Sequence, residues 1–144
     1  MKKAIKSTIS VALIIICIFS LASCGGNTET KTGLWEKATY LEDTEFGKGE
    51  KTALVEVKAE EKTVKFTINT DKKTVGAALS EHKLIEGEDG EFGLYIKVVN
   101  GITADYDIDK SYWAFYVDGE YATSGVDTTE IAEDVIYQLV YTKE

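Results

Sequence analysis

The sequence predicts an α+β fold in which a mixed sheet packs on one short helix. Two observations carry this prediction: apolar residues alternate with polar ones in several separate runs, and a single short segment between these runs has helical spacing. Strands on both sides of one helix in the chain indicate a sheet that wraps around that helix.

The first strands form a predicted hairpin. After position 51, apolar residues occupy every second position up to Ala59, and the pattern resumes after the polar pair Glu60-Glu61. Period-two alternation is typical of strands that bury one face. The inward-facing set is Ala53, Val55, Val57, Ala59, Val64, Phe66 and Ile68.

The predicted helix follows at Thr74, whose hydroxyl suits an N-cap. Val75, Ala78, Leu79 and His82 then fall at i, i+3, i+4 and i+7, which places them on one helical face. The helix is expected to end before Gly87. We therefore expect Val75, Ala78 and Leu79 to pack against the sheet.

The later strands lead into two hairpin signals, Asn100-Gly101 and Asp118-Gly119. Asp134 opens a last strand that is apolar on both faces, which predicts a central position covered on both sides. One face of this strand carries Val135, Tyr137, Leu139 and Tyr141, and the other face carries Ile136 and Val140. Hairpin, helix and further strands in this order match a β-grasp, whose first and last strands are adjacent and parallel.

The first 23 residues have the organisation of a signal peptide: a basic start with three lysines, then a short apolar core. Leu21-Ala22-Ser23-Cys24 resembles a bacterial lipobox. A transmembrane helix is the alternative, but the apolar centre is shorter than the roughly 20 residues that a span needs. The sequence therefore predicts an extracytoplasmic protein anchored to the cell membrane by lipid at Cys24.

Beyond the leader, the expected organisation is a flexible tether at 24–33, an N-terminal extension at 34–50 and the β-grasp domain at 51–144. Within the extension, Leu34 to Tyr40 is a candidate extra strand, and 43–50 is rich in turn residues. Cys17 leaves with the leader and Cys24 carries the lipid, so no disulfide is expected. The formal net charge of −9 excludes nucleic acid as a natural partner.

The C-terminal half resembles a known family. The segments that carry the resemblance are 93–101, Tyr112-Trp113 with Asp118-Gly119, Gly125-Val126 and 134–141. The family is a domain of unknown function similar to the C-terminal domain of transcobalamin. The resemblance implies a β-grasp fold that binds a soluble ligand, with a corrinoid as the leading candidate. Transcobalamin also has a helical domain, which this sequence lacks.

Catalysis and metal binding find little support in the sequence. His82 is the only histidine, and Ser80 two residues away does not share its helical face, so we expect a non-enzyme. Asp105, Asp107 and Asp109 have the spacing that opens a calcium loop, but Lys110 and Tyr116 replace the Gly and Glu of an EF-hand. Either a looser calcium site or a solvated acidic loop fits this segment.

Tyrosines form the candidate recognition surface. Along the strand that ends at Val117, Trp113 and Phe115 point one way, and Tyr112 and Tyr116 point the other. We expect Trp113 and Phe115 in the core and the two tyrosines, with Tyr106 and Tyr121, on a surface for a ligand or partner. Ordinary cross-strand aromatic packing is the alternative. Two functions remain open: binding of a small molecule, and docking on a membrane transporter or another surface protein.

Overall fold

The computed structural model describes residues 31–144 of the chain. The predicted leader, Cys24 and most of the predicted tether lie outside the described residues and stay predictions. Within residues 31–144, no helix combines the length and the apolar character needed to cross a bilayer.

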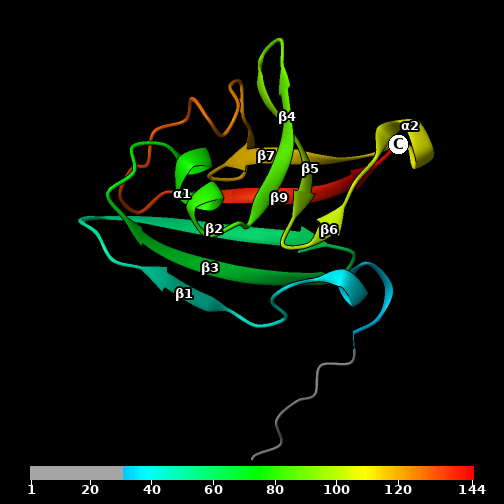
Figure 1. Ribbon diagram of the computed structural model, residues 1–144, viewed down its shortest axis with the longest axis horizontal. Coiled ribbons are helices and arrows are strands. Elements are labelled where there is room, and N and C mark those ends of the chain that lie inside the picture. The colour runs from blue at the N-terminus through cyan, green and yellow to red at the C-terminus, as the bar shows by residue number, and fades with distance from the viewer. Residues whose placement is uncertain (1–30) are drawn as a thin grey trace, which may run out of the picture. The chain divides into compact units, whose positions relative to one another are not determined.

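The described residues form one compact unit with two sheets and three short helices (Figure 1). The larger sheet has six strands in the order β1-β3-β2-β9-β7-β8, and the smaller has the order β4-β5-β6. The elements are η1 (Gly33–Lys37), β1 (Thr44–Gly47), β2 (Lys51–Ala59), β3 (Lys62–Thr70), α1 (Val75–Glu81), β4 (Ile85–Gly90), β5 (Gly93–Val99), β6 (Ile102–Thr103), α2 (Tyr106–Asp109), β7 (Ser111–Val117), β8 (Glu120–Tyr121) and β9 (Ile136–Lys143).

The predicted β-grasp topology is confirmed. Strands β2 and β3 form the expected antiparallel hairpin, and β2 pairs in parallel with β9, from Leu54 opposite Ile136 to Lys58 opposite Val140. Strand β7 then pairs antiparallel with the other side of β9. The first long strand and the last strand therefore lie side by side, as the order of elements predicted.

Helix α1 also matches the prediction. The Thr74 hydroxyl accepts a hydrogen bond of 3.3 Å from the backbone N–H of Ala77, which caps the helix. Val75, Ala78 and Leu79 are fully buried. In Figure 1, α1 and the β4-β5-β6 sheet lie over the same face of the larger sheet. The core between them contains Val55, Val57, Phe66, Ile68, Leu84, Ile96, Val99, Ile102, Trp113, Tyr137 and Leu139.

Two predictions about strands were wrong. The candidate strand at Leu34 to Tyr40 is instead the 3₁₀ helix η1, and the extra strand of this extension is β1, which pairs in parallel with β3. Phe46 of β1 packs edge-on against Tyr40, with ring centroids 5.2 Å apart. Strand β9 is central, but it is not covered on both sides, because Ile136 keeps 39% of its surface exposed. The two layers that cover the larger sheet, helix α1 and the β4-β5-β6 sheet, both lie on its opposite face.

Strand β4 was not predicted. Apart from Ile85, its residues are exposed and mostly acidic or glycine, so the segment carries no apolar alternation. It becomes a strand because the backbone of Glu86 to Gly90 pairs with β5. This pairing builds the hairpin that rises from the domain in Figure 1.

Candidate functional site

Strand β7 divides its aromatic side chains between two faces, as the alternation predicted. Trp113 and Phe115 point into the core, where they are 7% and 8% exposed. Trp113 also donates an indole hydrogen bond of 3.2 Å to the backbone carbonyl of Ile102. Tyr112 and Tyr116 are half-buried on the uncovered face of the sheet. The assignment of the two faces is therefore confirmed.

The four predicted tyrosines are organised as two edge-to-face pairs on this uncovered face. Tyr106 packs against Tyr112 with ring centroids 6.5 Å apart, and Tyr116 packs against Tyr121 at 5.5 Å. Ala114 lies between Tyr112 and Tyr116 along the strand and is almost fully buried. We call Tyr106, Tyr112, Tyr116 and Tyr121 the tyrosine row. The structure brings all four to one side of the sheet.

The environment raises the pKa of two phenols of this row, those of Tyr106 and Tyr112. The Tyr106 hydroxyl donates a 2.7 Å hydrogen bond to the carboxylate of Glu144, and this bond raises the pKa of Tyr106 above its usual value. Burial, as the main cause, raises the pKa of Tyr112. An unperturbed tyrosine already titrates near pH 10, so both side chains are neutral at physiological pH.

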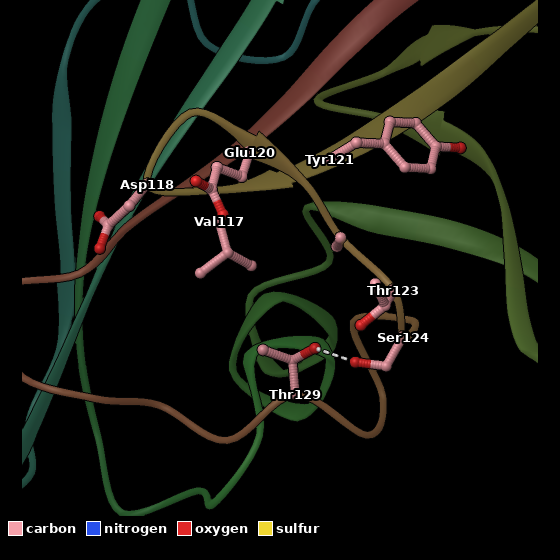
Figure 2. Close-up of a pocket in the computed structure, with 8 residues that line it drawn as sticks. Val117, Asp118, Glu120, Tyr121, Thr123, Ser124 and Thr129 are labelled. Atoms are coloured by element: carbon pink, nitrogen blue, oxygen red, sulfur yellow. Dashed lines mark hydrogen bonds between the residues drawn. The ribbon is translucent and has the colours of Figure 1, made fainter.

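A pocket of about 490 Å³ opens beside the β7–β8 turn, at one end of the tyrosine row (Figure 2). Of the four predicted tyrosines, only Tyr121 lines it, and in Figure 2 its ring points away from the hydroxyl groups of the other wall. Val117 points toward Thr129 in the same view. The pocket is lined by Val117, Asp118, Glu120, Tyr121, Ala122, Thr123, Ser124 and Thr129.

Local hydrogen bonds hold the walls of this pocket. Asp118 and Gly119 both have positive φ, 49° and 81°, as a tight two-residue hairpin requires. The Asp118 carboxylate accepts a 2.8 Å bond from the backbone N–H of Ile136, which ties the turn to the start of β9. On the other wall, the Thr129 hydroxyl donates to the Gly125 carbonyl at 2.8 Å and lies 3.3 Å from the Ser124 hydroxyl.

The chemistry of the pocket is that of hydrogen-bond acceptors. Two carboxylates and four hydroxyl groups, one of them the phenol of Tyr121, line it, and no lysine does. The sequence did not indicate Thr123, Ser124 and Thr129, because they lie in an irregular segment without periodicity. In the sequence, only the Asp118-Gly119 pair indicated this region, because it marks where the chain reverses after β7.

The acidic segment before β7 does not assemble a metal site. The Asp105 carboxylate caps α2 by accepting from the N–H of Asp107 at 3.0 Å. The Asp109 carboxylate accepts from the Ser111 hydroxyl and lies 3.3 Å from the Lys143 ammonium. The hydrogen bond from Ser111, as the main cause, lowers the pKa of Asp109. Among residues 31–144, no three His, Cys, Asp or Glu side chains converge as ligands for a metal ion.

His82 is packed as a structural side chain. Its ring stacks on Phe46 with centroids 4.9 Å apart. The buried Nε2 makes no hydrogen bond, and the Glu81 carboxylate at 3.9 Å is too distant for one. In the described part of the chain, no hydroxyl group is hydrogen-bonded to this imidazole, so the arrangement contains no activated nucleophile around it.

The fold and this site define a β-grasp domain with an open, acceptor-lined pocket. The model of DUF4430, a domain of unknown function, matches residues 72–136. A crystal structure from Ruminococcus gnavus ATCC 29149, described as a "putative metal binding protein", is 30% identical over 66% of this chain and 99% of that chain, with a TM-score of 0.62. The chain belongs to the DUF4430 family.

Haptocorrin in complex with Cbi shares the fold with a TM-score of 0.55 at 16% identity. The alignment covers 68% of this chain but only 26% of haptocorrin, so the chain spans about a quarter of that protein. The expected similarity to the transcobalamin type of domain is thereby confirmed at the level of the fold. A search of curated proteins found no match.

Proposed function

We propose that this protein is a non-catalytic lipoprotein, anchored outside the cytoplasmic membrane at Cys24, whose β-grasp domain binds a soluble small molecule. A corrinoid is the leading candidate ligand. Family membership and the fold shared with haptocorrin, which was crystallised with Cbi, support the binding role. The basic and apolar leader that ends in Leu21-Ala22-Ser23-Cys24 supports the anchor.

The observation that carries this proposal is the pocket beside the β7–β8 turn. Its volume of about 490 Å³ lies within the range of roughly 300–1,000 Å³ that is typical of small-molecule sites. Tyr121 belongs both to the pocket lining and to the tyrosine row, where its ring contacts that of Tyr116. A ligand seated in the pocket can therefore extend over the uncovered face of the sheet.

The full-length protein in detergent, titrated with cobalamin, cobinamide and haem by calorimetry and native mass spectrometry, tests this proposal. We expect saturable one-to-one binding of a corrinoid. Thr123→Trp, which fills the pocket, should abolish it, whereas Thr103→Trp, at an exposed position on β6, should not. Absence of binding by all three compounds would overturn the corrinoid assignment, and equal loss in both variants would place the site elsewhere.

The uncovered sheet face favours a second candidate function, docking on a membrane transporter or another surface protein. Tyr112 and Tyr116 lie outside the pocket and on an open face, which is the geometry of a docking surface rather than of a closed ligand site. The double variant Tyr112→Ala with Tyr116→Ala separates the two functions. If ligand binding survives in this variant but not in Thr123→Trp, the tyrosine row is free to serve a partner.

A further inference from the structure

We propose that the pocket beside the β7–β8 turn binds the ammonium group of an organic cation. This inference rests on the proposed binding of a small molecule and assigns a charge class to that ligand; it competes with the corrinoid assignment for the same pocket, because cobalamin and cobinamide carry no ammonium group. It concerns the carboxylates and the Ser and Thr hydroxyl groups that line the pocket; of the tyrosine row, only Tyr121 belongs to the lining.

The carboxylates of the pocket have charge that the protein does not neutralise. Among the described residues, no hydrogen bond or ion pair engages the side chain of Glu120. Asp118 accepts a bond from the Ile136 N–H through Oδ1, and its other oxygen has no partner in the described part of the chain. Neither carboxylate has a lysine beside it in the lining. The pocket therefore presents two negative charges to whatever enters it.

The remaining polar groups complete a set of acceptors. The hydroxyl oxygens of Thr123, Ser124 and Thr129 have lone pairs that can accept from an N–H donor. An ammonium group supplies three such donors and a compensating charge, and bonds of this charge-assisted kind are about twice as strong as neutral ones. An anionic ligand would meet only like charge here, because the sequence contains no arginine and no lysine lines the pocket.

An organic cation fits these groups better than a metal ion. A metal ion needs several ligands at fixed short distances, and the described residues contain no converging group of three or more. An ammonium group tolerates longer and less regular contacts. The formal net charge of −9 also attracts cations toward the domain from a distance.

The experiment compares three probes of equal chain length: butylammonium, butan-1-ol and butyrate. Each is titrated into the isotopically labelled full-length protein in detergent, and the amide NMR signals of Glu120, Ser124 and Thr129 are followed. We expect butylammonium alone to shift these signals saturably in the millimolar range, with an affinity that falls as salt is added. Absence of saturable shifts with butylammonium would overturn the proposal.

Isosteric variants test the role of the carboxylates. Glu120→Gln should weaken butylammonium binding by about tenfold, as expected for loss of one charge-assisted bond. Asp118→Asn, which tolerates the positive φ and keeps the acceptor for Ile136, should weaken it as well. Glu61→Gln removes the same charge from the turn between β2 and β3, at the far end of the sheet, and should have no effect. If Glu61→Gln weakened butylammonium binding as much as Glu120→Gln does, the loss would follow from the overall charge of the protein and not from the pocket, and the assignment would be overturned.

The outcomes also separate this inference from the proposed function. If butan-1-ol or butyrate shifts the same signals as strongly as butylammonium, the pocket binds ligands but does not select cations. If a corrinoid binds while butylammonium does not, the proposed function stands and the ammonium assignment fails. If butylammonium binds and all corrinoids fail, the pocket is a cation site and the ligand class must be sought among organic amines.

Discussion

The side chain of Asn100 binds the backbone of Tyr40 through two hydrogen bonds, although 60 positions separate these residues. Its Oδ1 accepts from the Tyr40 N–H at 2.9 Å, and its Nδ2 donates to the Tyr40 carbonyl at 2.8 Å. Asn100 also has a positive φ of 51° in the β5–β6 turn. One residue thus shapes a hairpin and holds the N-terminal extension on the domain.

Replacing Asn100 by Gly should destabilise the domain while preserving the turn. Glycine tolerates the positive φ, but both bonds to Tyr40 are lost at a site that is 1% exposed. We expect a loss of roughly 1–3 kcal/mol in the free energy of unfolding, measured by urea denaturation. Asn100→Asp keeps the acceptor for the Tyr40 N–H but sets a carboxylate oxygen against the Tyr40 carbonyl at this buried site, so it should lose at least as much. A Gly variant as stable as wild type would show that the extension does not depend on this clamp.

The pair Glu56 and Gln138 should give a measurable pH effect. The Gln138 amide donates a 2.7 Å hydrogen bond to Glu56 across the parallel pair β2–β9, and this bond, as the main cause, lowers the pKa of Glu56. In Gln138→Leu, NMR titration should show the pKa of the Glu56 carboxyl moving upward. Thr142→Val, on the same face of β9, is the control and should leave that pKa unchanged.

The same pair predicts how stability depends on pH. A carboxyl whose pKa is lower in the folded state stabilises the protein above its unfolded pKa, and that contribution is lost as the pH falls through the folded pKa. The difference in urea midpoint between wild type and Gln138→Leu should therefore be largest near neutral pH and narrow on acidification below about pH 4.5. A difference that widens with acid would contradict this linkage.

Leu79 should be among the most costly residues of α1 to truncate. Its side chain is fully buried against the sheet, so Leu79→Ala removes apolar contacts and leaves a cavity. The expected cost is about 2–5 kcal/mol. Ser80→Ala, one position along and exposed, should remain within about 0.5 kcal/mol of wild type. Equal denaturation midpoints for the two variants would show that this helix face is not part of the core.

The two faces of β7 should respond differently to truncation. Trp113→Ala should cost about 3–5 kcal/mol, because the indole is buried and binds the Ile102 carbonyl. Trp113→Phe keeps much of the ring and should lose about 1 kcal/mol for that bond. Tyr112→Ala, on the uncovered face, should be milder than Trp113→Ala in the same thermal or urea melts. The reverse order would contradict the assignment of faces.

Cys24→Ala should release the protein from the membrane or leave it unprocessed. The prediction follows from the leader and the four residues that end in Cys24. Fractionation should move the variant out of the membrane pellet, and mass spectrometry of the N-terminal peptide should no longer find the diacylglyceryl group. Cys17→Ala, within the leader, should behave as wild type. Full membrane retention of the Cys24 variant would refute the anchor.

The order of residues along the chain was sufficient to predict those elements whose sequence signals span only a few residues. The β2–β3 hairpin follows from alternation, α1 follows from Thr74 and the spacing of Val75, Ala78 and Leu79, and both tight turns follow from an Asn-Gly or Asp-Gly pair. The inward direction of Trp113 follows from strand parity together with the more apolar character of its face. These features depend on contacts between near neighbours in the chain, and so the sequence alone determined them.

Tertiary structure decided the features that depend on distant partners. The segment around Phe46 becomes a strand because β3 offers it an edge, and β4 forms because β5 pairs with its exposed backbone. The second face of β9 stays open because both covering layers lie on the other side of the sheet. The pocket depends on a turn and an irregular segment that meet only after folding, so Thr123, Ser124 and Thr129 left no signal in the sequence. Contacts of this kind arise from packing and not from the local order of residues.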